Sequence, residues 1–151
     1  MAAADITAKD TVVKGVNSLN NYTRFEAHLL DGTEHPGILA ADTHDLFKIP
    51  AGNAVTGITI VSLDTATSSG SATATFKAKV GTADAEALHS AVALADLAAG
   101  DTAKFLTTKI KGYAADAETL IQLTVGTAAF TKLKLLVIVE YVPVVEFMTA
   151  G

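Results

Sequence analysis

The chain has 151 residues and a formal net charge of −5, with 11 Lys and Arg against 16 Asp and Glu. This length suffices for one domain with a real core. The basic residues are scattered and form no stripe that could neutralise several phosphates, so nucleic-acid binding is not expected. Cysteine is absent, which excludes disulfides, thiol chemistry and zinc sites with Cys ligands.

Half of the residues are apolar, but only 6% are aromatic and Trp is absent. Ala, Val, Leu and Ile must therefore fill most of the core. Charged residues make up 18% of the chain, below the usual ~25%. A surface of Thr, Ser, Ala and Gly suits a protein that works against other protein, and it also suits an ordinary neutral β-domain.

Neither end of the chain predicts secretion or membrane insertion. Residues 1–5 lack the basic start and apolar run of a signal peptide. The most apolar stretch, residues 133–147, is interrupted by Lys134, Glu140 and Pro143. It falls short of the ~18 uninterrupted apolar residues that a spanning helix needs. We expect a soluble protein without a membrane segment.

The first half of the chain predicts an arm followed by short strands. Residues 1–21 are small, polar and weakly patterned, which favours an N-terminal arm. Residues 22–30 predict a strand closed by the turn Asp31-Gly32. Residues 44–49 predict a second strand that must stop at Pro50, since proline lacks the N–H that a central strand needs.

Two further strands follow. Residues 55–63 are rich in Ile, Val and Thr, which pack well on a pleated surface. In residues 71–80 apolar side chains alternate with Ser, Thr and Lys. The apolar set is Ala72, Ala74, Phe76, Ala78 and Val80. Successive strand residues point to opposite faces, so the alternation predicts one buried and one solvated face.

Residues 84–99 leave two alternatives open. A short helix is favoured by the abundant Ala, by Asp84 as a cap and by Gly100 as an end. Its apolar stripe is not clean, because Leu94 and Leu97 lie outside it. The stripe would consist of Leu88, Ala91, Val92 and Ala95. A loop with a short strand fits the same residues.

Three strands are predicted in the last third of the chain, at residues 103–110, 118–125 and 132–141. In the second, Ile121, Leu123 and Val125 share a face. In the last, one face is formed by Leu133, Leu135, Val137, Val139 and Tyr141. Leu136 and Ile138 make its opposite face apolar as well, so this strand is either central in a two-layer core or covered by a partner.

Short strands separated by turns every ten or so residues predict an all-β fold, an antiparallel β-sandwich or a jelly-roll-like barrel. The expected organisation is an arm at residues 1–21, a sandwich domain at residues 22–142 and a C-terminal tail at residues 143–151.

The densest group of possible metal ligands lies between residues 28 and 45. It consists of His28, Glu34, His35, Asp42, His44 and Asp45. A metal site needs three or four of them to converge, and their spacing matches no known ligand motif. We interpret the segment as a polar loop between strands, with a small metal-dependent enzyme as an alternative. Ser90 directly follows His89, but the sequence around it lacks the nucleophile-elbow motif Gly-x-Ser-x-Gly. From these two observations we predict no catalytic, cofactor-binding or metal-binding residue.

The C-terminal end is apolar and must fold back or be buried in a neighbour. Together with the outer side of the last strand it supplies the candidate interface residues. These are Leu136, Ile138, Val142, Val144, Val145, Phe147 and Met148.

Residues 45–58 resemble a recurring segment of tailed-phage virion proteins, in which a strand ends in Ile-Pro-Ala-Gly and the next opens Val-x-Gly. Here these pieces are Ile49-Pro50-Ala51-Gly52 and Val55-Thr56-Gly57. Further resembling pieces are residues 23–27, 31–33, 113–116, 123–129 and 137–142. The resemblance spans residues 22–142.

The resemblance implies a non-enzymatic head decoration, cement or minor virion protein with a jelly-roll-like sandwich. Its partners would be the major capsid protein or other virion proteins and further copies of itself, as a trimer or dimer. It would reside in the virion after assembly in the host cytoplasm and need no cofactor. We expect both ends of the chain to carry intersubunit contacts. An alternative is a carbohydrate- or receptor-binding β-sandwich of a phage fibre or tail.

Overall fold

The computed structural model describes residues 11–16, 23–106 and 117–143. Its elements are β1 (Thr11–Val16), β2 (Arg24–Asp31), η1 (Pro36–Leu39), β3 (Thr43–Ile49), β4 (Asn53–Ser62), β5 (Thr67–Ser68), β6 (Thr73–Val80), β7 (Glu86–Ala87), β8 (Val92–Ala93), η2 (Leu94–Asp96), β9 (Thr102–Leu106), β10 (Thr119–Gly126), β11 (Phe130–Lys132) and β12 (Lys134–Pro143). Among the described residues the only helices are the 3₁₀ turns η1 and η2, and none is long and apolar enough to cross a membrane.

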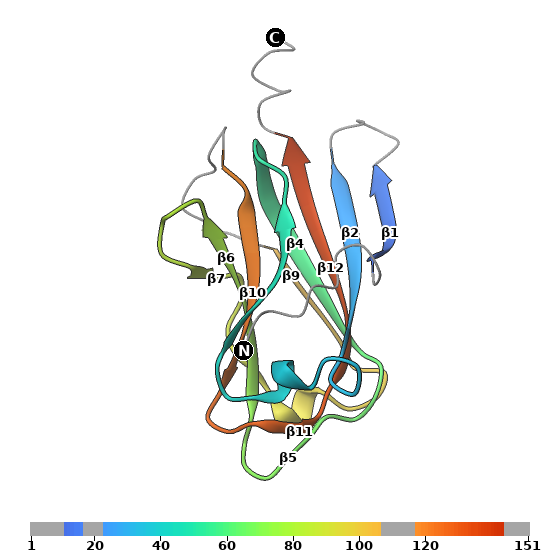
Figure 1. The fold of residues 1–151 in the computed structure, drawn as a ribbon. Coiled ribbons are helices and arrows are strands. Elements are labelled where there is room, and N and C mark those ends of the chain that lie inside the picture. Colours follow the sequence, from blue (N-terminus) through green and yellow to red (C-terminus); the bar gives the residue numbers. More distant parts are fainter. Residues whose placement is uncertain (1–10, 17–22, 107–116, 144–151) are drawn as a thin grey trace.

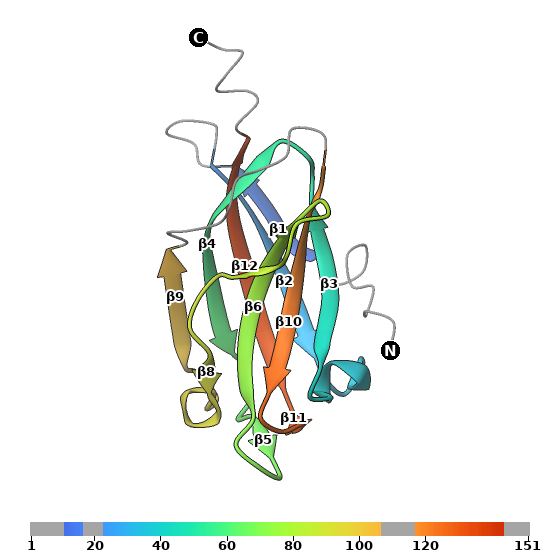
Figure 2. The same cartoon turned by 90° about the vertical axis from the view of Figure 1, so that its left-hand side faces the viewer.

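Two antiparallel sheets lie face to face, as Figure 1 and Figure 2 show. Sheet A has the strand order β1-β2-β12-β4-β9. Sheet B has the order β3-β10-β6-β7, and β8 also pairs with β6. A small β11-β5 ribbon lies at one end of the two layers. The prediction of an all-β antiparallel sandwich is confirmed.

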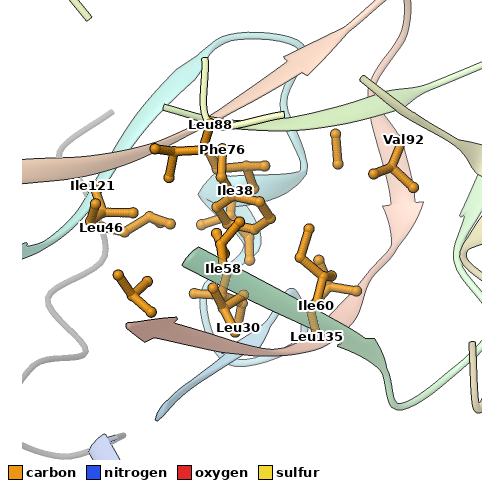
Figure 3. Packing of buried hydrophobic residues seen from close by; sticks show 14 of the residues in the cluster. Leu30, Ile38, Leu46, Ile58, Ile60, Phe76, Leu88, Val92, Ile121 and Leu135 are labelled. Carbon is orange, nitrogen blue, oxygen red and sulfur yellow. The ribbon is translucent and has the colours of Figure 1, made fainter. Parts of the chain in front are cut away.

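Alternating side chains of both sheets fill the core between them. Four residues of the predicted buried face around β6, Ala72, Ala74, Phe76 and Ala78, are at most 1% exposed, and Val80 at the strand end is half-buried. In Figure 3, Phe76 and Ile121 of sheet B lie across the core from Ile58 and Leu135 of sheet A. Each such buried aliphatic or aromatic side chain contributes about 1.5–3 kcal/mol relative to an exposed one.

Strand β12 is the centre of sheet A, with β2 on one side and β4 on the other. Its residues alternate between buried and half-buried along the whole strand. Its buried face holds four residues of the predicted set, Leu135, Val137, Val139 and Tyr141, and the fifth, Leu133, is buried just before the strand begins. β12 is therefore central in the two-layer core, as one of the two sequence-based alternatives states. Its other face is also apolar, so the second alternative, a covering partner, stays a prediction.

The connection between β3 and β4 carries the chain from sheet B to sheet A. Pro50 ends β3 as predicted, and Gly52 has φ 82°, a left-handed conformation that glycine adopts without strain. Asn53 Nδ2 donates to the carbonyl of Pro50 at 2.9 Å and closes the turn. This turn holds the residues on which the resemblance to virion proteins rests.

Of the two alternatives for residues 84–99, the structure has the loop with short strands and not the short helix. β7 and β8 both pair with β6, and only the three residues of η2 are helical. The backbone N–H of Leu88 donates to the carbonyl of Phe76 at 2.9 Å. Leu97, which lies outside the helical stripe, is 2% exposed. Backbone pairing and burial of this leucine outweigh the intrinsic helix preference of alanine.

The expected arm contains strand β1, which pairs antiparallel with β2 at the edge of sheet A. The small residues and the weak apolar–polar alternation of residues 1–21 favour irregular chain, so this strand is a difference from the prediction. An edge strand needs only one backbone neighbour, so weak side-chain patterning does not prevent it. The strand predicted at residues 103–110 is β9 as far as Leu106, and residues 107–110 lie outside the described part.

Candidate interaction surface

The outer face of sheet A carries the candidate interface residues that the structure describes. Leu136, Ile138 and Val142 are half-buried on β12 and alternate with residues of the core. Leu136 pairs with Leu29 of β2 and Val61 of β4. The remaining candidates, Val144, Val145, Phe147 and Met148, lie outside the described residues.

Neighbouring strands extend this apolar surface with residues that the sequence reasoning missed. β2 contributes Phe25, Ala27 and Leu29, and β4 contributes Val61. Ala27 is 5% exposed because Ile138 lies beside it in the register. A period of two in residues 22–30 could have grouped the β2 residues, but only sheet pairing places them next to β12.

A hollow of about 390 Å³ opens on this face. Phe25 and Ile138 give it an apolar wall, and Glu140 and Lys104 give it one charge of each sign. We define the apolar face as Phe25, Ala27, Leu29, Val61, Leu136, Ile138 and Val142 with this hollow.

The outer face of sheet B is polar apart from the half-buried Leu120 on β10. Thr43 Oγ1 and Thr124 Oγ1 lie 2.9 Å apart on adjacent strands. Gln122 Nε2 donates to Asp45 Oδ1 at 2.7 Å. The outward residues of β6 are threonines and lysines. Sheet B therefore has the polar outer face that an antiparallel sheet normally presents to water, whereas the outer face of sheet A is apolar.

A buried polar network lies on the inner face of sheet A. Tyr141 Oη donates to Glu26 Oε2 at 2.9 Å, and His28 Nε2 lies 3.1 Å from Glu26 Oε1. Burial raises the pKa of Tyr141, and the hydrogen bond to Glu26 raises it further, so the hydroxyl keeps its proton. The His28 ring stacks on the ring of Phe47 in sheet B, with 3.8 Å between the ring centroids. The network thus joins two strands of sheet A and contacts the opposite sheet.

The possible metal ligands between residues 28 and 45 do not gather at one place in the described structure. His28 is in the core, and His44 Nε2 lies 2.8 Å from the carbonyl of Ala40. Asp45 accepts a hydrogen bond from Gln122 on the outer face of sheet B. No three His, Asp or Glu side chains within the described ranges are placed to hold a metal ion.

His89 and Ser90 form no nucleophile–base pair either. His89 Nε2 accepts the backbone N–H of Phe76 at 3.0 Å, and its Nδ1 donates to the Ser90 carbonyl at 2.6 Å. The His89 imidazole stacks on the Phe105 ring, with 4.5 Å between the ring centroids. Burial lowers the pKa of His89, although the Ser90 carbonyl opposes the shift. This neutral ring ties the 84–99 segment to β6 and β9.

The chain matches no protein-family model, no curated protein and no solved structure.

Proposed function

We propose that this chain is a non-enzymatic structural protein of a tailed-phage virion, which decorates or cements the capsid. The observation that carries the proposal is the apolar face on sheet A, opposite a polar outer face on sheet B. Contiguous apolar surface of this kind marks a contact with another protein.

The architecture suits a structural role. Two sheets share one close-packed core, and core side chains such as Phe76, Ile121 and Leu135 are fully buried. Close-packed interiors have low compressibility and transmit strain. A sandwich of this type can therefore hold a contact surface in a fixed shape on a particle.

The resemblance to virion proteins supports the same proposal. The segment Ile49-Pro50-Ala51-Gly52 forms the connection between β3 and β4, and Val55 and Gly57 follow on β4. The resembling motif thus coincides with the passage from one sheet to the other. The partners proposed are the major capsid protein or other virion proteins, and further copies of this chain.

The two ends are proposed to add to these contacts. Val144, Val145 and Phe147 supply apolar side chains beyond β12. Burying each in a neighbour would contribute ~1.5–3 kcal/mol before the cost of ordering the chain is subtracted. Residues 1–21 would supply the second extension.

Heads assembled without this protein test the proposal. We expect the purified full chain to bind them saturably at micromolar concentration and to raise their melting temperature, because a cementing contact is lost only when the head disassembles. Sedimentation of the heads measures the bound protein, and scanning calorimetry measures the melting temperature.

Two variants give this experiment its control. Leu136→Glu places a charge on the apolar face and should weaken head binding. Leu120→Glu changes the matching half-buried leucine on the outer face of sheet B, between Lys48 and Lys79, and should not. The proposal is wrong if the wild-type chain does not bind, or if both variants bind as it does.

A further inference from the structure

We propose that the apolar face of sheet A pairs with the same face of a second copy of this chain, as a two-fold symmetric dimer. This inference rests on the proposed function and deepens it. It names a second copy, one of the proposed partners, as the protein that covers the apolar face. It selects the dimer from the two oligomeric states that the sequence analysis leaves open.

The apolar side chains form one continuous area. Leu136 lies between Leu29 and Val61, and the next outward residue of β12, Ile138, lies between Ala27 and Thr59. Phe25 follows on β2, beside Glu140. The apolar residues therefore cover the middle of the sheet across β2, β12 and β4.

Strand β2 turns Phe25, Ala27 and Leu29 outward and Glu26, His28 and Leu30 inward. Glu26 is 2% exposed and His28 is fully buried, whereas Phe25 and Leu29 are half-buried on the outer face. Burying a carboxylate in the core is costly and needs compensating partners. In an isolated sandwich Phe25 and Leu29 stay half-buried, whereas covering the outer face buries them as well.

The two charges that line the hollow select a second copy as the partner. Glu140 lies on β12 beside Gly57, and Lys104 lies on β9 beside Thr59. Neither forms a salt bridge within the described part of the chain. A two-fold axis that lies in the plane of the contact, above β4 between Gly57 and Thr59 and at right angles to the line from Glu140 to Lys104, places each of these side chains over the other. Each Glu140 then faces the partner copy's Lys104, and both charges are compensated.

A partner surface with charges of only one sign would leave one of these two groups unpaired in the contact, which is costly. A second copy avoids this cost by its symmetry, because a two-fold interface uses the same surface on both subunits. The hollow of about 390 Å³ beside Phe25 and Ile138 would receive a side chain of the second copy.

The size of sheet A agrees with the needs of a stable dimer. Its five strands, about 4.8 Å apart, are about 24 Å wide, and the ten residues of β12 are about 33 Å long. The outer side of the whole sheet therefore offers at most about 800 Å², as much as the ~800 Å² that each partner contributes to a standard interface. The apolar face is the middle part of this area, across β2, β12 and β4.

Charge reversal tests the dimer. Light scattering and sedimentation equilibrium of the full chain should give a dimer for the wild type at tens of micromolar. Glu140→Lys or Lys104→Glu alone sets like charges against each other, and each should raise the dissociation constant about tenfold or more. The double variant Glu140→Lys/Lys104→Glu restores the pairing and should return the constant to within about threefold of wild type.

Ile138→Glu should abolish the dimer and Leu120→Glu should leave it intact, while circular dichroism shows that both remain folded. The inference is overturned by a monomeric wild type, by a trimer, or by a double variant no better than the single ones. Head binding separates this failure from failure of the proposed function: a monomer that still binds heads saturably contradicts only the dimer.

Discussion

Phe76→Ala is expected to lower the free energy of unfolding by about 3–5 kcal/mol, because the surrounding core cannot collapse into the space left by the ring. Phe76 is fully buried at the centre of sheet B, where β6 pairs with β10. At this chain length the melting temperature should fall by about 10 °C. Urea denaturation followed by circular dichroism gives the free energy, and calorimetry gives the melting temperature.

Leu63→Ala is the control for the core variant. Leu63 is 45% exposed, and its truncation should change the free energy of unfolding by no more than about 0.5 kcal/mol. Equal destabilisation by Phe76→Ala and Leu63→Ala would show that the two sheets do not close on the core described here.

Glu26→Ala is expected to destabilise the fold by about 2–6 kcal/mol, because two buried groups each lose a hydrogen-bond partner at a cost of about 1–3 kcal/mol. The substitution takes away the acceptor of the Tyr141 hydroxyl and the carboxylate beside His28. His28 is fully buried and Tyr141 is 6% exposed, so little water can replace the lost contacts. Chemical denaturation at neutral pH measures the change.

Two further variants separate the network from a general effect of losing a carboxylate. Tyr141→Phe removes one donor but leaves Glu26 beside His28, and should cost about 1–2 kcal/mol. Glu118→Ala removes an exposed carboxylate 3.8 Å from Lys48 and should change stability little. If Glu26→Ala is no more destabilising than Glu118→Ala, the buried network does not support the fold.

The strands with strict alternation were predictable because a period of two has one structural reading. Residues 71–80 and the Ile121, Leu123 and Val125 set placed their apolar side chains on the buried face as expected. Leu136 and Ile138 were predictable as surface candidates for the same reason, since β12 has apolar residues on both faces.

The orientation of β2 was not predictable from local pattern. Alternation groups Phe25 with Ala27 and Leu29, and Glu26 with His28 and Leu30, but it does not say which group faces the core. Hydrophobicity alone would have buried Phe25 and Leu29. The observed orientation depends on Tyr141, which is 115 residues away in sequence and supplies the hydrogen bond that makes Glu26 acceptable inside.

The weakly patterned segments depend on pairing with distant or neighbouring strands. β1 forms because β2 offers a free edge, and β7 and β8 form because β6 does. Lys104 joins the surface only because β9 pairs with β4. Such contacts are set by the register of the whole sheet, and no motif in the sequence marks them.

The protein composition of purified particles tests the proposed structural role in the virion. Virions of the phage proposed to encode this chain would be banded on a density gradient and their proteins quantified by mass spectrometry. A structural protein of the virion bands with the particles at a fixed copy ratio to the major capsid protein and stays bound through a second gradient, and we expect this result. If the chain is present in the soluble fraction of the lysate and absent from the banded particles, it has no structural role in the virion.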